Sequence, residues 1–367
     1  MKFKINREEL KQTLARIYNV VERKTTKPIL SNALIKCQSN ELIICGTDLE
    51  VGLQIKLEAQ VEESGEIAVP AKSLYDIVRE LSSEQVHFEL KEEAWLEILA
   101  GRSKFKVAVL PAKEFPSMPE VPSEGSIHFE SQSFQEMITK TLFAVSTDET
   151  KYNINGVYLS SPAPKQVRMV ATDGHRLSYE EKPMIEESTL PDSLLLPRKG
   201  VLEIQKLLAD WEGPFPFYFE GRNAIVQTEN TTLFIRLIEG EFPKYQQIIP
   251  KENHLMASVS KEQLIGAIRR VSLLSPEHHR GIKFVFSSGN LELLCSNPNL
   301  GEAREEVECE YKGKHLEIGF NFRYMLDVLG VMEDEKVQIA LKDEVSPCLI
   351  RSESDPGFLS LVMPMRL

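Results

Sequence analysis

Residues 171–177, Ala-Thr-Asp-Gly-His-Arg-Leu, bring a carboxylate, an imidazole and a guanidinium close together in the chain. Asp173 and His175 have the side chains of an orienting carboxylate and a general base, a combination that hydrolases use. Asp173-Gly174 is also a turn dipeptide, because both residues tolerate a positive φ. No nucleophile or third catalytic group accompanies the pair, so the sequence favours a binding loop and leaves a hydrolase as the alternative.

The last seven residues, Leu361 to Leu367, form a second candidate for function and read Leu-Val-Met-Pro-Met-Arg-Leu. Methionine side chains adapt to several apolar partners, and Pro364 ends a strand and turns the chain across the surface. We expect this segment and the loop at 171–177 to form two walls of one docking pocket. A frayed tail after a final strand is the alternative interpretation.

Other signatures of catalysis or of metal binding are missing from the sequence. It contains no G-x-G-x-x-G, G-x-x-x-x-G-K-S/T, H-E-x-x-H or G-x-S-x-G. His278 and His279 are adjacent and would point about 100° apart on a helix, which makes a poor chelate. No cofactor or metal is therefore expected. The cysteines form no C-x-x-C pair and are expected to be reduced, mostly structural thiols; they are Cys37, Cys45, Cys295, Cys309 and Cys348.

Length and composition indicate a globular chain of more than one domain. The 367 residues are too many for one comfortable core, and 42% hydrophobic with 27% charged residues is ordinary for a soluble protein. We expect a cytoplasmic protein with no membrane partner, because neither a signal peptide nor an apolar run of about 20 residues is present. The net charge of −12 disfavours a conventional DNA-binding regulator, which is usually basic, but leaves that class as a third alternative.

One pattern of strands and helices occurs three times along the chain, with a period of about 125 residues. A period of this length indicates duplicated domains and not a solenoid. We therefore predict three similar α+β domains at residues 1–122, 123–251 and 252–367. The period is marked by Thr47-Asp48-Leu49, Thr172-Asp173-Gly174 and Ser296-Asn297-Pro298, and by Glu114-Phe115-Pro116 with Glu241-Phe242-Pro243.

Apolar stripes at helical spacing predict two helices in each round. Four prolines between residues 110 and 122 predict a linker outside any sheet or helix. The stripes are Leu10, Leu14, Ile17 and Val21; Leu74, Ile77, Val78 and Leu81; Phe134, Met137, Ile138, Thr141, Leu142 and Val145; Val201, Ile204 and Leu208; Leu264, Ala267, Ile268 and Val271; and Phe322, Met325, Leu326 and Leu329.

Positive charge is concentrated in these helices. The six helical windows are together slightly basic, although the last one, 321–335, is acidic, and the rest of the chain is strongly acidic. Helices facing a central hole would offer sequence-blind contact with phosphates. Solvated amphipathic helices are the alternative explanation.

Five stretches together resemble the bacterial β sliding clamp, the processivity subunit of replicative DNA polymerase III. The resemblance covers the whole chain. It implies three similar α+β domains, each with two helices on antiparallel sheets, and two chains joined head to tail in a ring around duplex DNA, with helices lining the hole. It also implies a tether without catalytic activity. The stretches are Ala171–Leu177, Leu196–Gly200, Phe242–Tyr245, Ile318–Asn321 and Val362–Leu367.

The resemblance further implies a pocket for short, extended peptides between the second and third domains. The polymerase III catalytic subunit, the clamp loader, other polymerases and repair proteins would share it. Apolar residues would receive a leucine and a phenylalanine, and Arg176 would fix the polar part of the motif. Gln247 and Asn153 depart from the family pattern. The pocket carried over by motif comprises Ile154, Thr172, Gly174, His175, Arg176, Leu177, Pro243, Ile248, Leu361, Val362, Met363, Pro364, Met365 and Arg366.

For DNA and for the homodimer, the resemblance implies two further sets of residues. A head-to-tail joint uses two different patches and must close to avoid filaments. The DNA-contacting positions would be Arg23, Lys24, Lys72, Arg198 and Lys199, and the joint would bring Phe105 and Val107 of one chain against Leu273 and Leu274 of the other.

Overall fold

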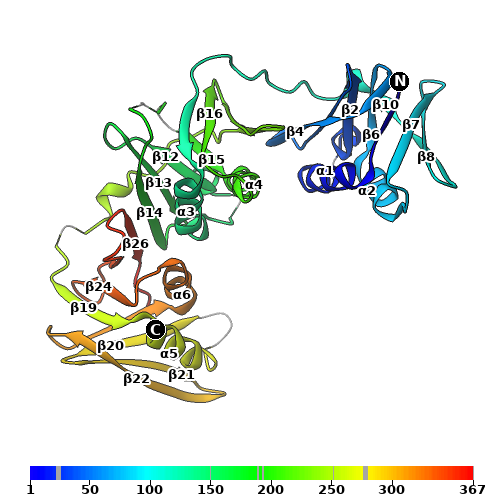
Figure 1. The fold of residues 1–367 in the computed structure, drawn as a ribbon. Coiled ribbons are helices and arrows are strands. Elements are labelled where there is room, and N and C mark those ends of the chain that lie inside the picture. The colour runs from blue at the N-terminus through cyan, green and yellow to red at the C-terminus, as the bar shows by residue number, and fades with distance from the viewer. Residues whose placement is uncertain are drawn as a thin grey trace. The chain divides into compact units, whose positions relative to one another are not determined.

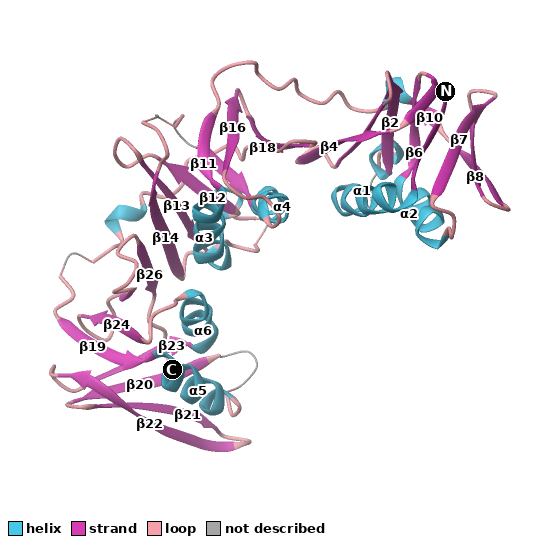
Figure 2. Cartoon of the chain, viewed as in Figure 1, coloured by secondary structure: helices cyan, strands magenta, loops and turns pink. Residues whose placement is uncertain are grey.

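The computed structural model describes residues 1–21, 26–148, 150–187, 190–191, 194–250, 252–275 and 280–366. The chain divides into two compact units, the first made of Met1–Ser131 with Leu202–Leu237 and the second of Gln132–Val201 with Ile238–Leu367. Figure 1 labels the elements, and Figure 2 shows that both units are mainly sheet with a few helices. The helices that the structure describes are each too short or too polar to cross a membrane.

We use three module names that follow the repeated pattern. The first module contains α1, α2 and β1–β10, the second α3, α4 and β11–β18, and the third α5, α6 and β19–β26. The described residues form six α-helices: α1 (Arg7–Val20), α2 (Ala71–Glu80), α3 (Ser131–Thr141), α4 (Arg198–Leu208), α5 (Lys261–Ser272) and α6 (Phe322–Val331). The predicted pair of helices in each round is therefore confirmed.

The first unit contains a five-stranded and a nine-stranded antiparallel sheet. The smaller sheet has the order β5-β1-β7-β8-β9, and the larger has the order β10-β6-β2-β3-β4-β18-β17-β16-β11. The larger sheet runs from the first module into the second where β4 pairs with β18, with Phe234 opposite Gly52. Its strands are β2 (Asn32–Gln38), β3 (Glu41–Thr47), β4 (Val51–Glu58), β6 (Gly65–Pro70), β10 (Leu110–Pro111), β11 (Ile127–Glu130), β16 (Pro214–Glu220), β17 (Asn223–Gln227) and β18 (Thr231–Arg236); those of the smaller sheet are β1 (Lys2–Asn6), β5 (Gln60–Glu63), β7 (Gln85–Lys91), β8 (Trp95–Ala100) and β9 (Ser103–Ala108).

The described residues of the second unit form a twelve-stranded sheet. Its strand order is β15-β12-β13-β14-β26-β25-β24-β19-β22-β21-β20-β23. Here β14 pairs with β26 and joins the second module to the third. Helices α3, α5 and α6 lie along one side of these strands (Figure 2). The strands are β12 (Gly156–Ser160), β13 (Gln166–Thr172), β14 (Arg176–Pro183), β15 (Leu194–Pro197), β19 (Leu255–Ser260), β20 (Gly281–Ser287), β21 (Asn290–Asn297), β22 (Gly301–Tyr311), β23 (Leu316–Asn321), β24 (Lys336–Leu341), β25 (Cys348–Arg351) and β26 (Phe358–Val362).

Most residues of the apolar stripes are buried, although Ile77, Phe322 and Leu326 are half-buried, and several helices end earlier than the stripes predict. Leu142 lies in a 3-10 turn after α3, and Val145 follows that turn. Val21 and Leu81 are the C-cap residues of α1 and α2 and are extended. These apolar residues are buried although they lie outside the helices, except Leu142, which is half-buried. Burial therefore does not mark the helix end.

The predicted linker is partly wrong. Leu110–Pro111 forms β10 and pairs with β6, so a proline does lie in a sheet. The physical reason is that β10 is an edge strand, where a missing N–H removes no ladder hydrogen bond. Phe115 then turns inward and packs with Leu34, Cys45 and Ala68.

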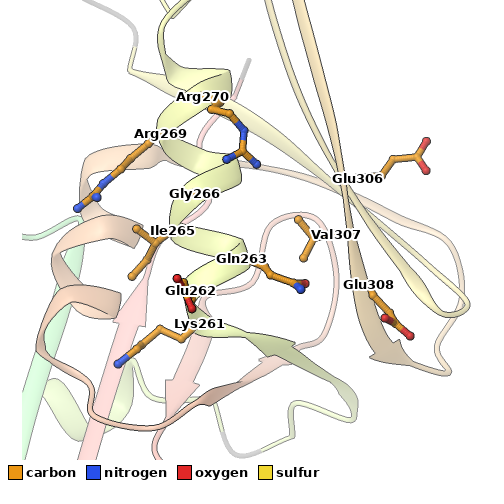
Figure 3. Close-up of a pocket in the computed structure, with 10 residues that line it drawn as sticks. All are labelled: Lys261, Glu262, Gln263, Ile265, Gly266, Arg269, Arg270, Glu306, Val307 and Glu308. Atoms are coloured by element: carbon orange, nitrogen blue, oxygen red, sulfur yellow. The ribbon is translucent and has the colours of Figure 1, made fainter.

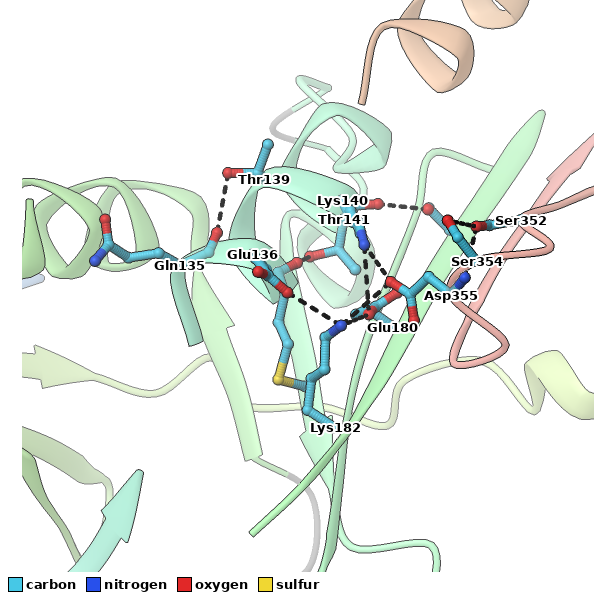
Figure 4. Close-up of polar contacts among 12 residues, drawn as sticks. Gln135, Glu136, Thr139, Lys140, Thr141, Glu180, Lys182, Ser352, Ser354 and Asp355 are labelled. Atoms are coloured by element: carbon cyan, nitrogen blue, oxygen red, sulfur yellow. Dashed lines mark hydrogen bonds and ion pairs between the residues drawn. The ribbon is translucent and has the colours of Figure 1, made fainter. Parts of the chain in front are cut away.

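A buried ionic network joins the second module to the third within the second unit (Figure 4). Lys140 of α3 and Lys182 of β14 both pair with Asp355, which precedes β26, and the Lys182–Asp355 distance is 3.2 Å. Lys182 also lies 2.9 Å from Glu180 and 3.0 Å from Glu136. Burial raises the pKa of Glu180 to about 7, against the opposing effect of Lys182. Burial alone would raise the pKa of Asp355, but hydrogen bonds from Lys140 and other neighbours lower it to about 2.

Candidate functional site

The loop from Thr172 to Arg176, which we call the Thr172 loop, joins β13 to β14 and is shaped by its own side chains. The Thr172 hydroxyl donates to the carbonyl oxygen of Arg176 at 2.6 Å and accepts the Gly174 N–H at 3.1 Å. Asp173 Oδ1 accepts the N–H groups of His175 at 2.9 Å and Arg176 at 3.0 Å. Gly174 has a φ of +91°, a conformation that favours glycine. The sequence therefore specifies this loop locally.

The carboxylate of Asp173 serves the structure of the loop. Its second oxygen accepts from Arg176 Nε at 3.1 Å, so both oxygens are used by the loop itself. The His175 side chain is exposed, and its carbonyl oxygen accepts the N–H of Met363. A hydrolase of this kind needs a carboxylate that orients an imidazole, whereas Asp173 accepts its hydrogen bonds from the loop backbone and from Arg176 Nε.

Arg176 is 9% exposed and connects the two modules. Its NH1 donates to Asp327 of α6 at 2.5 Å, and its NH2 donates to the carbonyl oxygen of Phe143 at 2.5 Å. The guanidinium also lies 4.3 Å from the centroid of the Tyr324 ring, a cation–π distance. Arg176 therefore fixes the Thr172 loop against the third module, and its expected role in holding a peptide stays a prediction.

The C-terminal segment lies beside this loop. In the pairing of β14 with β26, Arg176 is opposite Val362 and Leu177 is opposite Leu361. After β26, the Met363 N–H donates to His175 at 2.9 Å, and the Met365 N–H donates to the carbonyl oxygen of Gly319 at 2.8 Å. The segment is thus held on the surface, and the two expected walls are brought together.

Below these walls is a small apolar core that includes Leu177, Leu361 and Tyr245. Phe242 packs against it and stacks on Tyr158 with ring centroids 5.1 Å apart. The Tyr245 hydroxyl accepts from Arg168 at 2.8 Å. The sequence analysis did not include Phe242, Tyr158 and Tyr245 among the site residues. The Glu-Phe-Pro repeat, which contains Phe242, was the signal that could have indicated this part of the site.

The expected pocket residues divide into a buried support and an exposed rim. Ile154, Thr172, Arg176, Leu177, Leu361 and Val362 are buried. Gly174, His175, Pro243, Ile248, Met363 and Arg366 are exposed, and Pro364 and Met365 are half-buried. A rim of imidazole, proline, isoleucine and methionine over an apolar base suits an extended peptide that inserts apolar side chains.

The expected DNA-contacting residues are placed at helix starts, as far as they are described. Lys72 lies in the first turn of α2, and its side chain is 72% exposed. Arg198 and Lys199 begin α4. Cations oppose the helix dipole at an N-terminus, so helix stability does not explain them. Arg23 and Lys24 lie outside the described residues, as do His278 and His279.

The expected joint residues lie on exposed edges. Phe105 of β9 is 38% exposed, and Leu273, just after α5, is 77% exposed. Val107 and Leu274 are half-buried. In the described part of the chain, β9 pairs with β8 alone, and Gly301–Glu308 of β22 pair with β21 alone. Both strands therefore leave one side unpaired.

Cysteine chemistry plays no visible part in the site. All five cysteines are free and buried. Burial raises the pKa of Cys45 to about 12 and that of Cys309 to about 11, which keeps both as thiols. In the residues that the structure describes, no group of three or more His, Cys, Asp or Glu could hold a metal ion.

The repeated module is that of the DNA clamp class of folds. Family models for the DNA polymerase III beta subunit match the chain three times: the N-terminal domain at residues 1–119, the central domain at 128–244 and the C-terminal domain at 246–366. The chain belongs to the beta sliding clamp family.

Relatives and solved structures of this family are similar over their full lengths. The beta sliding clamps of Pseudomonas putida and Caulobacter vibrioides are 37% and 34% identical, with 100% of each chain covered. The crystal structure of the DNA polymerase III subunit beta from Pseudomonas aeruginosa has a TM-score of 0.94 at 36% identity, with 100% of both chains covered. A sliding clamp from Bartonella birtlesii bound to griselimycin has a TM-score of 0.94 at 32% identity, again covering 100% of both chains.

Proposed function

We propose that two copies of this chain close head to tail into a ring around duplex DNA and tether the replicative polymerase to it. The ring catalyses no reaction. Its sequence-independent grip lets it slide, and the tether confers processivity. The clamp loader and other polymerases and repair proteins would use the same peptide site at the Thr172 loop and the C-terminal segment. A protein that serves the bacterial replicative polymerase acts in the cytoplasm.

The observation that carries this proposal is a pattern of strand pairing between modules. The third strand after the first helix of one module pairs with the third strand after the second helix of the next module. In this way β4 pairs with β18, and β14 pairs with β26. In the third module the strand that corresponds to β4 and β14 is β22, and in the first module the strand that corresponds to β18 and β26 is β9, the third strand after α2. Each has an unpaired side in the described residues. Pairing β22 with β9 of a second copy completes the pattern and hides both edges.

Charge on the two free edges supports this joint. Strand β9 carries Lys104 and Lys106 and no acidic residue, whereas the free part of β22 carries four glutamates, Glu302, Glu305, Glu306 and Glu308, against one cation, Arg304. Opposite charges favour the encounter and fix the register of two edges. The joint would also cover the exposed Phe105 and Leu273. We propose, as expected from the sequence, that Phe105 and Val107 of one chain contact Leu273 and Leu274 of the other.

A groove beside β22 offers room for the partner copy. It has a volume of about 890 Å³ and lies between α5 and β22 (Figure 3). Ile265 and Val307 form its apolar part, and Arg269, Glu306 and Glu308 are among its charged residues. An apolar strip flanked by charges on an open strand edge is typical of an interface that a second chain covers.

The cations at the starts of α2 and α4 support sequence-independent contact with DNA. A phosphate near Lys72, Arg198 or Lys199 would relieve the unfavourable interaction of these cations with the helix dipole. Such contacts position a protein on DNA without reading bases. We also propose that Arg23 and Lys24 contact DNA phosphates.

We further propose three domains, at residues 1–122, 123–251 and 252–367.

The test is retention on closed and open DNA. The protein is loaded on a nicked circular plasmid by a clamp-loading ATPase and passed over a sizing column in high salt. We expect co-elution with the circle and loss after a restriction enzyme linearises it. Equal retention on both forms would indicate a conventional DNA-binding protein and contradict the ring.

The peptide site and the hydrolase alternative are separated by His175→Ala. We expect weaker binding of partner peptides and unchanged retention on circular DNA. A hydrolytic turnover that this substitution abolishes would support the enzyme instead.

A further inference from the structure

The first module contains a loop with the same internal hydrogen bonds as the Thr172 loop. The Thr47 hydroxyl donates to the carbonyl oxygen of Val51 at 2.9 Å and accepts the Leu49 N–H at 3.0 Å. Asp48 Oδ1 accepts the N–H groups of Glu50 at 3.0 Å and Val51 at 2.7 Å. We call residues 47–51 the Thr47 loop. Each bond has a counterpart in the Thr172 loop, so the two loops are structurally equivalent.

The surroundings of the two loops are equivalent as well. The N–H of Arg236, at the end of β18, donates to the carbonyl oxygen of Glu50 at 2.8 Å, as Met363 does to His175 at 2.9 Å. After Phe115-Pro116, the Met118 side chain packs over β4, where a Cβ on Gly52 would lie 2.5 Å from Met118 Cε. The junction of the first and second modules therefore has the construction of the peptide site.

A groove of about 500 Å³ lies at this junction, within the first unit. A volume of that size accommodates a few side chains of an extended peptide. Its apolar part includes Leu49, Pro116, Met118 and Phe234. Its charged residues are Glu50, Arg222 and Arg236, all of which are exposed.

Leu49 is an unusual residue for its position. It has a φ of +76°, the left-handed conformation that Gly174 adopts in the equivalent loop, and its side chain is 44% exposed. A leucine in this conformation is strained, and an exposed side chain gains little from burial. Neither local preference nor core packing accounts for a leucine there, whereas contact with an apolar ligand does.

We propose that this groove is a second peptide-docking site, which takes an extended segment of a partner protein that alternates aliphatic and acidic residues. An aliphatic side chain contacts Leu49 and Met118 on the apolar part, and carboxylates face Arg222 and Arg236. The two arginines outnumber Glu50, so the charge of the groove favours an acidic occupant in a chain that is acidic elsewhere. The inference rests on the proposed function in treating the Thr172 loop as a peptide site.

The probe is a fluorescein-labelled hexapeptide of alternating leucine and aspartate, and the readout is its fluorescence anisotropy with the full chain. We expect Arg222→Glu to weaken binding at least about tenfold, since it places a carboxylate against the acidic probe. A probe with lysine in place of aspartate should bind Arg222→Glu better than the original chain. Leu49→Gly should weaken the acidic probe while the melting temperature stays equal or rises, because glycine relieves the strained φ. Val345→Gly, which removes an exposed aliphatic side chain remote in sequence, is the matched control and should bind normally.

A second probe with photo-reactive leucine locates the bound peptide by cross-linking and mass spectrometry. Cross-links at residues 47–52, 116–119 or 222–236 support the second site. Absence of binding, or cross-links confined to residues 172–177 and 361–366, overturns it. Met363→Asp tests the other site independently: if that substitution leaves every partner peptide bound, the proposed function of the Thr172 loop fails while the groove is judged by its own variants.

Discussion

The backbone N–H of Met363 donates to the carbonyl oxygen of His175 at 2.9 Å. This bond continues the pairing of β14 with β26 one step beyond the last strand residue and ties the C-terminal segment to the Thr172 loop. The Met365 N–H then donates to Gly319 of β23. The Thr172 loop and β23 thus hold the segment, and the alternative of a frayed tail is wrong for the residues up to Met365.

Deleting residues 363–367 should remove peptide binding and leave the fold intact. The deletion breaks two backbone hydrogen bonds near the surface, each worth about 1 kcal/mol, and spares the buried β26. We expect affinity for partner peptides to fall at least about tenfold in anisotropy titrations and the midpoint of thermal unfolding to change little. Full peptide binding by the shortened chain would show that the segment is not a wall of the site.

Replacing Arg176 should destabilise the chain far more than replacing its partner Asp327. Arg176→Met removes the side-chain donor from Asp173 Oδ2 and from the Phe143 carbonyl oxygen in a nearly buried place, which costs about 2–4 kcal/mol. The Asp327 side chain is 44% exposed, so Asp327→Asn should cost less than about 1 kcal/mol. Urea unfolding of the two single variants and the double variant measures the difference and the coupling. Similar costs for both single variants would contradict the structural role given to Arg176.

The ionic network around Glu180 should make stability depend on pH in an unusual direction. The pKa of Glu180 rises from 4.5 to about 7 on folding, mainly because the side chain is buried. Between pH 4.5 and about 7 the folded state binds more protons than the unfolded state. The contribution of Glu180 to the free energy of unfolding is therefore fully present below pH 4.5 and is lost as pH rises towards 7, by up to about 1.4 kcal/mol per pH unit. The pKa of Asp355 falls from 3.8 to about 2, so its contribution is present above 3.8 and is lost as pH falls.

This pH dependence is measured by urea unfolding between pH 4.5 and 8. Glu180→Gln should flatten the curve in that range, because the titrating group is gone. Glu136→Gln is the matched control: it removes another partner of Lys182 but keeps Glu180, so the slope should stay. An unchanged slope in Glu180→Gln would assign the effect to other groups.

The elements of this fold were predictable where local patterns determine them. The stripe Leu264, Ala267, Ile268 and Val271 gives α5, and the Asp-Gly turn gives the Thr172 loop, because spacing and turn chemistry are local. The pairing of β4 with β18 was not predictable from pattern, since any two apolar strands satisfy the same alternation. The contact of Arg176 with Asp327 is also non-local, so the sequence did not show that this guanidinium connects two modules.

Contacts with DNA at the helix starts should show in the salt dependence of binding. Each cation that meets a phosphate contributes close to one unit to the slope of log affinity against log salt. Lys72→Glu and Arg198→Glu should each weaken binding to short duplexes equally for all sequences and reduce that slope. Lys342→Glu, at an exposed position outside the helix starts and both free edges, is the control and should leave the slope unchanged. A sequence-dependent loss would indicate base contacts instead.

A charge on the apolar part of either free edge should separate the two chains without unfolding them. Phe105 lies on the exposed edge β9, and Leu273 protrudes after α5, so Phe105→Asp or Leu273→Asp places a carboxylate where the partner copy would bury it, at a cost of several kcal/mol. Light scattering should give a mass near twice 41.7 kDa for the original chain and near 41.7 kDa for either variant at micromolar concentration. Because the two residues belong to different patches of a head-to-tail joint, mixing the two variants cannot restore a closed ring, as each ring needs both joints intact. Ile185→Asp, an exposed residue on neither edge, should remain dimeric. A chain that is monomeric before any substitution would remove the basis for the ring.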